Sequence, residues 1–344
     1  MSLIEVRDLG RTFAVRRRDP ATTGDRRAVR PSRRRLRSEV QAVRDLTFSI
    51  DAGEMVGYIG PNGAGKSTTI KMLTGILVPT SGHLRVAGLD PSRQRTELAR
   101  RIGVVFGQRT TLWWDLPLRD SFALLQKIYR VDPAVHRRTL AEYVELLDLG
   151  DLLDTPVRQL SLGQRMRGDI TAALLHGPEI LYLDEPTIGL DVVSKGRLRE
   201  FLRTLNRERG TTLMLTTHDL QDIEALCDRV IVIDHGTAVF DGPLGRLHGH
   251  AGATRTLVVD LVDEAPPIVV PGARTRRVDG PRQWLSFPAD ESAAPIVAAV
   301  ASAYDVADLS IQEPDIEDVI RDLFRPAERG ASPGPGAVSP PGRS

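Results

Sequence analysis

The sequence has one cysteine, Cys227, among its 344 residues. A single cysteine excludes an internal disulfide and zinc sites built from several cysteines, and we expect Cys227 to be a small buried residue in a helix. No uninterrupted apolar run approaches the roughly 20 residues that span a bilayer. Residues 1–6 lack the basic region and long apolar core of a signal peptide. We therefore expect a soluble intracellular chain.

The sequence also lacks a large net charge, because 46 Lys and Arg face 45 Asp and Glu. This balance excludes binding to nucleic acid or membrane through bulk charge. The arginines are nevertheless concentrated in residues 16–37, where Pro20 and Pro31 break regular structure. We predict an exposed, mobile insertion over 15–40. A solvated loop is the leading interpretation, contact with anionic lipid is the second, and nucleic acid is not expected because no aromatic residue separates the arginines.

The length of the chain predicts two domains, or one large domain with appendages. Strand and helix patterns divide the chain outside the insertion. Short apolar runs separated by helical stretches predict a mainly parallel sheet covered on both faces; these runs are 55–59, 102–106, 180–183, 212–216 and 230–233. A short strand is expected at 3–7. A smaller α/β pattern occupies 250–325, with strands at 255–261 and 283–287 and helices at 293–303 and 315–324. The Pro-, Gly- and Ser-rich end, 326–344, is expected to be disordered.

A phosphate-binding motif follows the first of these apolar strands. It reads Gly60-Pro61-Asn62-Gly63-Ala64-Gly65-Lys66-Ser67-Thr68 and fits G-x-x-x-x-G-K-[ST] between a strand and a helix. Glycines let backbone N–H groups face a phosphate, and a helix N-terminus favours an anion. In this pattern Lys66 bridges the β- and γ-phosphates and the Ser67 hydroxyl binds Mg²⁺.

Two carboxylates end another apolar strand, Ile180-Leu181-Tyr182-Leu183-Asp184-Glu185. Asp184 is placed to hold the water shell of Mg²⁺, and Glu185 can reach an attacking water as general base. His218 follows the apolar strand 212–216, at the end of a sheet strand where ligands gather in open α/β folds. This placement favours a contact with the γ-phosphate, although a lone histidine is usually structural.

With these motifs the sequence resembles the ATPases of ABC transporters. Leu160-Ser161-Leu162-Gly163-Gln164 is similar to the family signature LSGGQ, with Leu162 in place of the first glycine. Gln108 corresponds to the family's Q-loop glutamine, Gly189-Leu190-Asp191 to the D-loop and His218 to the switch histidine. Six motifs occur in family order, and the resemblance covers roughly residues 3–245.

The resemblance implies a role for each matching residue. Lys66, Ser67 and the rest of the 60–68 motif would hold the phosphates of ATP. Gln108 would sense Mg²⁺ and the γ-phosphate, Glu185 would polarise water and His218 would orient it. Phe13 lies where the family has an aromatic that stacks on adenine, with core packing as the alternative. Ser161, Gly163, Gln164 and Asp191 would reach the nucleotide held by a second subunit.

The resemblance also implies the architecture and the partners. We expect an α/β P-loop NTPase of the ABC ATPase type over 1–245, with a mainly parallel core sheet, an antiparallel β subdomain and a helical subdomain at about 109–175. A small accessory α/β domain would follow at 250–325. Two copies would form a head-to-tail ATPase dimer, most simply a homodimer, on separate permease subunits at the cytoplasmic face of the plasma membrane.

The class of ABC machine follows from spacing and composition. The stretch between Lys66 and Ser161 is too short for the long coiled coil of chromosome-maintenance ATPases, and translation-factor relatives usually carry two such domains. The segment 106–117 looks like that of exporters that pair with separate permeases, and we expect Trp113 or Trp114 to line the permease groove, with core packing as the alternative. A soluble ABC-like ATPase acting on ribosomes or DNA and a non-catalytic nucleotide-gated scaffold are the other interpretations.

Overall fold

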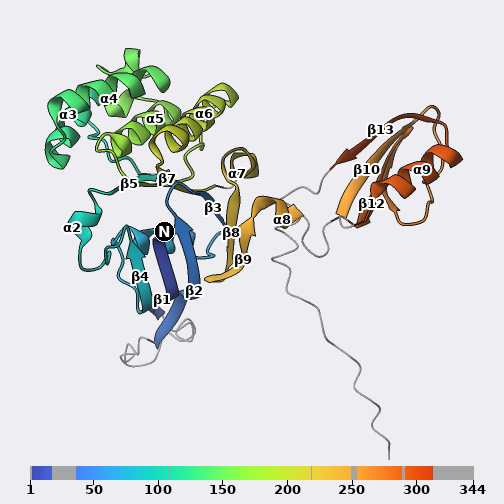
Figure 1. Cartoon of the computed structure of the whole chain (residues 1–344), viewed down its shortest axis with the longest axis horizontal. Helices are drawn as coiled ribbons and strands as arrows, with labels where there is room; N and C mark the ends of the chain where they lie inside the picture. The colour runs from blue at the N-terminus through green and yellow to red at the C-terminus, as the bar shows by residue number, and fades with distance from the viewer. Residues whose placement is uncertain are drawn as a thin grey trace, which may run out of the picture. The chain divides into compact units, whose positions relative to one another are not determined.

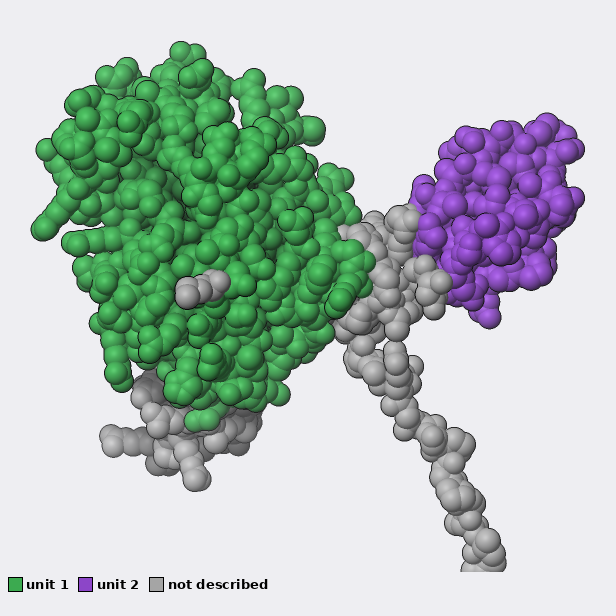
Figure 2. Space-filling model, viewed as in Figure 1, with its two compact units in different colours: residues 1–249 green, residues 250–344 purple. Residues whose placement is uncertain are grey.

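The computed structural model describes residues 2–17, 36–107, 109–217, 219–248, 254–288 and 291–312. The chain divides into two compact units, residues 1–249 and residues 250–344, which Figure 2 shows in different colours. Three predicted features lie outside the described residues: the helix at 315–324, the tail 326–344 and most of the arginine-rich insertion.

A six-stranded sheet forms the centre of unit 1. Among the described residues its strand order is β5-β6-β7-β3-β8-β9, and only β9 runs antiparallel to its neighbour. The strands are β3 (Met55–Ile59), β5 (Ile102–Phe106), β6 (Ile180–Asp184), β7 (Thr212–Thr216), β8 (Arg229–Asp234) and β9 (Thr237–Pro243). The mainly parallel core sheet predicted from the five apolar runs is confirmed, because such runs are stable only where both sheet faces are covered.

A second, antiparallel sheet has the order β2-β1-β4. Its strands are β1 (Ser2–Arg17), β2 (Leu36–Asp51) and β4 (Ser81–Val86). The strand predicted at 3–7 is therefore too short, and the insertion predicted over 15–40 is wrong at both ends, where Arg17 pairs with Leu36. Arginines do not prevent this pairing, because the ladder is made by backbone groups.

Helices of unit 1 connect these strands. They are α1 (Lys66–Leu73), α2 (Arg95–Leu98), α3 (Leu118–Tyr129), α4 (Pro133–Leu146), α5 (Leu162–Leu174), α6 (Val192–Arg209), α7 (Leu220–Leu226) and α8 (Leu244–His248), with 3-10 turns at Gly150–Leu152 and Val157–Gln159. In Figure 1, α3, α4 and α5 gather at one end of the unit and the antiparallel sheet lies at the other. The predicted helical subdomain corresponds to the first of these groups.

One apolar core joins the two sheets through α1. Ile4 of β1, Val43 of β2, Ile70 of α1 and Tyr182 of β6 belong to the same buried cluster. Burying such side chains stabilises the fold by about 1.5–3 kcal/mol each. Because α1 is packed between the sheets, the loop that precedes it is held at the edge of the core sheet.

The single thiol lies against the core sheet. Cys227 is buried and follows the last residue of α7, so it caps this helix rather than lying within it. A Cβ added at Gly57 of β3 would lie 3.7 Å from its Sγ. Burial raises the pKa of Cys227 to about 12, and the thiol is therefore protonated at neutral pH.

The described residues of unit 2 form a four-stranded antiparallel sheet and one helix, and the strand order is β11-β12-β10-β13. The elements are β10 (Thr254–Leu261), β11 (Arg274–Asp279), β12 (Arg282–Pro288), α9 (Ala293–Ala303) and β13 (Val306–Gln312). Leu257, Leu285, Phe287 and Ile296 form a core that contains residues of unit 2 alone. The strands and the helix predicted at 255–261, 283–287 and 293–303 agree with β10, β12 and α9.

Candidate active site

The predicted phosphate-binding motif forms the turn between β3 and α1. Gly63 and Gly65 have φ of +85° and +108°, values that L side chains rarely adopt. A Cβ at Gly65 would also lie 2.6 Å from the carbonyl oxygen of Ala42 on β2. The backbone N–H of Gly236, in the β8–β9 turn, donates to the carbonyl of Ala64 at 2.9 Å. The turn is therefore held between β2 and the β8–β9 turn, in a path that only glycine allows at Gly65.

Lys66 begins α1, and its ammonium group lies inside this turn. Nζ donates to the carbonyl oxygens of Gly60 at 2.5 Å and Pro61 at 3.1 Å. Burial lowers the pKa of Lys66, and the nearby carboxylates of Glu185 and Asp184 act in the opposite direction. A charge that is partly desolvated in this way binds an incoming anion strongly.

The two predicted carboxylates lie at the end of β6. The Thr216 hydroxyl donates to Asp184 Oδ1 at 2.5 Å, which fixes one carboxylate oxygen. Glu185 has φ of +55°, and its backbone N–H donates to the Thr216 carbonyl at 2.8 Å. A non-glycine residue with positive φ costs of order 1–3 kcal/mol and is typical of functional sites. This backbone turn directs consecutive carboxylates to the same cavity.

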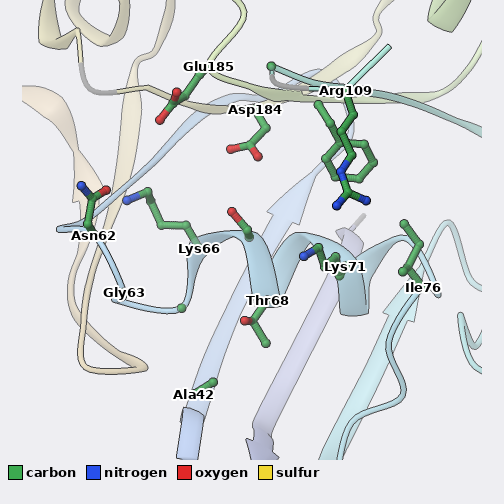
Figure 3. A pocket seen from close by; sticks show the side chains of 14 residues that line it. Ala42, Asn62, Gly63, Lys66, Thr68, Lys71, Ile76, Arg109, Asp184 and Glu185 are labelled. Carbon is green, nitrogen blue, oxygen red and sulfur yellow. The ribbon is translucent and has the colours of Figure 1, made fainter. Parts of the chain in front are cut away.

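The phosphate-binding turn and the carboxylates line one cavity of about 550 Å³. In Figure 3, Asp184 and Glu185 lie on one side of α1, while Thr68 points to the side on which Ala42 lies. The predicted residues in the lining are Asn62, Gly63, Gly65, Lys66, Ser67, Thr68, Asp184 and Glu185. A cavity of this size, lined by the Lys66 ammonium group, two carboxylates and the turn glycines, can hold a nucleoside triphosphate.

Sequence reasoning missed several residues of this site. Lys71, one turn beyond Ser67 on α1, and Arg109 both line the cavity and add positive charge. The i, i+4 spacing of Ser67 and Lys71 on one helix was a usable signal, whereas Arg109 belongs to a loop without regular spacing. Gln108 and His218, predicted to contact Mg²⁺ and the γ-phosphate, lie outside the described residues.

A buried carboxylate that was not predicted holds the segment after Gln108. Asp169 of α5 accepts hydrogen bonds from the Thr110 hydroxyl at 2.9 Å, the Thr111 N–H at 2.9 Å and the Thr111 hydroxyl at 3.1 Å. Burial raises the pKa of Asp169, and these hydrogen bonds oppose the shift. This contact ties the cavity-lining loop to the helix that begins at the predicted signature.

The signature and the D-loop each contain the N-cap residue of a helix. Ser161 caps α5: its hydroxyl accepts from the Gln164 N–H at 3.2 Å, and its own N–H donates to Gln164 Oε1 at 2.9 Å. Asp191 caps α6 and accepts from the Ser194 N–H at 3.0 Å. Neither Ser161, Gly163, Gln164 nor Asp191 is among the described residues that line the cavity.

The unusual Leu162 packs on the D-loop of the same chain. Gly189 has φ of +73°, and a Cβ there would lie 2.5 Å from Leu162 Cδ2. A Cβ at the neighbouring Gly163 would in turn lie 2.7 Å from Leu190 Cδ2. The two glycines therefore let the start of α5 and the D-loop touch.

Phe13, the predicted adenine contact, lies on β1 opposite Val40 of β2. Its ring is half-buried, and the Arg11 guanidinium lies 4.7 Å from the ring centroid. Phe13 is not among the described residues that line the cavity, although Ala42, two positions beyond Val40 on β2, is. The structure thus places Phe13 on the strand pair beside the cavity.

The fold and the site define a P-loop ATPase of the ABC type. The family described as "ABC transporter" matches residues 43–188. The daunorubicin/doxorubicin resistance ATP-binding protein DrrA of Streptomyces peucetius is 36% identical over 261 residues, which cover 71% of this chain and 78% of DrrA. The methionine import ATP-binding protein MetN 2 of Burkholderia pseudomallei (strain K96243) is 37% identical, covering 71% of this chain and 62% of MetN 2.

A solved structure shows the same relationship. The ATP-binding cassette MJ0796, described as dimeric in a post-hydrolysis state bound to ADP and Pi, is 25% identical. The match has a TM-score of 0.59 and covers 70% of this chain and 98% of that one. The chain belongs to the ABC transporter ATP-binding proteins, and it binds and hydrolyses ATP. Within the described part of the chain, no helix is long and apolar enough to cross a membrane.

Proposed function

We propose that this chain powers export of a small molecule, as one half of a head-to-tail ATPase dimer on separate permease subunits. The observation that carries the proposal is the division of the site. The cavity is lined by Lys66, Asp184 and Glu185, whereas Ser161 of the signature lies outside the lining. A second copy, turned head to tail, would bring its signature to this cavity.

Exposed apolar side chains beside the signature and the D-loop support this pairing. Leu162, Ile188, Val192 and Val193 are between 38% and 87% exposed, with Val192 the most exposed. Apolar residues grouped in this way are typical of a surface that another protein covers. The first of these residues follows the signature serine, and the other three flank the D-loop.

Within such a dimer each residue of the cavity would have a defined task. Lys66 and the backbone N–H groups of the turn would stabilise charge on the phosphates. Glu185 would accept a proton from the attacking water. The Ser67 hydroxyl and Asp184 fit Mg²⁺, which prefers oxygen ligands and shares phosphate oxygens, and Gln108 would complete this set. Bound Mg²⁺ would supply charge neutralisation on the triphosphate.

The remaining parts of the proposal concern direction, location and domains. The proposal of export is supported by the similarity to DrrA, a resistance protein. The import protein MetN 2 is about equally similar, so a transport assay is needed to test the direction. We propose a cytoplasmic-face location, a cassette over 1–245 and an accessory domain over 250–325. The anionic-lipid contact of the arginine-rich insertion stays a prediction.

The substitution Glu185→Gln tests the proposed mechanism. The amide cannot accept the proton, so hydrolysis should fall by about a hundredfold or more while ATP binding persists. The variant should then accumulate as an ATP-dependent dimer in size-exclusion chromatography with light scattering. Lys66→Ala is the matched control, because it should lose ATP binding and stay monomeric. Hydrolysis by Glu185→Gln at the wild-type rate would mean that another group is the base.

A further inference from the structure

A second buried carboxylate, that of Asp222 on α7, connects three segments of unit 1, one of which follows the cavity-lining Glu185. Asp222 is 0% exposed. Its Oδ1 accepts from Arg199 of α6, with Nη2 at 2.5 Å and Nε at 2.7 Å. Its Oδ2 accepts from the Thr187 hydroxyl at 2.5 Å and the Thr217 hydroxyl at 3.4 Å. Both carboxylate oxygens are thus engaged by side chains from outside α7.

The two threonines belong to the segments that carry the predicted catalytic groups. Thr187 lies two residues after Glu185, and Thr217 immediately precedes His218. Both threonines are buried, at 4% and 5% exposure. Because Oδ2 of Asp222 accepts from both hydroxyls, it fixes the distance between the loop after β6 and the end of β7.

A second ion pair strengthens the same connection. Lys195, one turn before Arg199 on α6, donates from Nζ to Asp219 Oδ2 at 2.5 Å. The Asp219 N–H donates to the Thr217 hydroxyl at 3.0 Å, so this hydroxyl is held from both sides. Helix α6 begins at the D-loop, and through Lys195 and Arg199 it is tied to the first turn of α7.

We propose that Asp222 is a positioning residue for ATP hydrolysis, holding the Glu185 loop against the end of β7 through Thr187 and Thr217. This inference rests on the proposed role of Glu185 as the base. Asp222 does not line the cavity, so it acts on the reaction through the backbone that it holds. A base must stay within hydrogen-bond reach of its water, and a misplacement of about 1 Å can cost about a hundredfold in rate.

The hydroxyl of Thr187 offers the sharpest test, since its removal leaves the Arg199–Asp222 ion pair in place. Thr187→Val keeps the shape and deletes the hydrogen bond. We expect kcat for ATP to fall by about tenfold to a hundredfold, while the KM for ATP stays close to wild type. The thermal midpoint should fall modestly, because the buried Asp222 carboxylate loses one donor. Thr187→Ser keeps the hydroxyl and should restore kcat. Thr139→Val, at a buried threonine of α4, controls for the loss of any buried hydroxyl.

A double-mutant cycle with Asp222→Asn completes the experiment. If both residues act through one contact, Thr187→Val should cost little more in kcat once Asp222 is replaced. Additive effects, or an equal change in KM and kcat, would overturn the proposal, as would wild-type turnover by Thr187→Val. Glu185→Gln is measured in parallel. If Glu185→Gln is inactive and Thr187→Val is normal, only the positioning role fails; if Glu185→Gln is active, the proposed mechanism itself fails.

Discussion

Asp169 is a buried acid whose hydrogen bonds hold the loop beside the cavity, and its charge makes the fold sensitive to pH. Burial raises its pKa above the ordinary value of 3.8. The folded protein therefore binds this proton more readily than the unfolded chain does. The contribution of this group to stability is fully present below pH 3.8 and is lost as the pH rises through the raised pKa.

The neutral variant Asp169→Asn should remove that dependence while its amide oxygen still accepts from Thr111. Relative to wild type, Asp169→Asn should gain free energy of unfolding as the pH rises from 4 to 7. Asp169→Ala should lose about 1–3 kcal/mol, because it leaves buried donors without an acceptor. Urea unfolding of the three proteins at both pH values measures this. A difference between wild type and Asp169→Asn that does not vary with pH would contradict the expectation.

The site residues that could be predicted from the sequence are those at fixed positions in a motif, either between a strand and the helix that follows it or at the end of an apolar strand. Lys66, Asp184 and Glu185 fall into this class, and the structure brings them to one cavity. Arg109, Asp169 and Asp222 could not be found in this way. The partners of Asp169 and Asp222 lie far away in sequence, as with Asp222 and Thr187, and a hydrogen bond between distant segments leaves no periodic pattern. Arg109 lies in a loop, which has no regular spacing.

At the scale of elements, the contact between α5 and the D-loop predicts a compensating pair of substitutions. Gly189→Ala should destabilise the protein, because its Cβ would collide with Leu162 and its φ is positive. In a Leu162→Gly background the collision is absent and about 1 kcal/mol of backbone strain remains. We expect a coupling of about 1–3 kcal/mol in a double-mutant cycle followed by thermal unfolding. Additive losses would show that the two segments do not touch.

The loop that leads into α3 carries two tryptophans and predicts a contact with membrane subunits. Trp113 and Trp114 are 37% and 50% exposed, and this exposure disfavours core packing. Neither tryptophan lines the pocket of about 210 Å³ beside β5, so the expected contact is with the exposed rings themselves. We expect Trp113→Ala and Trp114→Ala to reduce co-purification of a membrane subunit by about tenfold or more, with basal hydrolysis retained. Ile128→Ala, at an exposed residue of α3, is the control. Normal recovery of the subunit with both variants would exclude this contact.

Strands could be predicted from the sequence where burial on both faces makes them uniformly apolar. The core strands have this character, and β6 is buried at four of its five positions. The strands β4 and β11 were not predicted, because they are short and mostly exposed, so that polar side chains such as Arg274 and Arg277 fill them. Edge strands of this kind are stabilised by backbone pairing more than by side-chain pattern.

For the whole molecule, the proposed division of the site between two copies predicts that activity depends on protein concentration. A solitary chain would present its cavity without the partner's signature. The specific rate of ATP hydrolysis should therefore fall in proportion to concentration once the protein is diluted below its dimerisation constant. Serial dilution in a coupled ATPase assay, with light scattering on the same samples, measures both quantities. A specific rate that stays constant while the protein is monomeric would contradict the dimer.

The buried thiol of Cys227 has a practical consequence for following the association of two chains. Its high pKa and its position against β3 leave almost no thiolate to react with a maleimide at neutral pH. A cysteine introduced at an exposed position such as Val193 would then be the sole attachment point for a fluorophore. Pairs of labelled chains could report, by energy transfer, when ATP brings two subunits together, without first removing the native thiol.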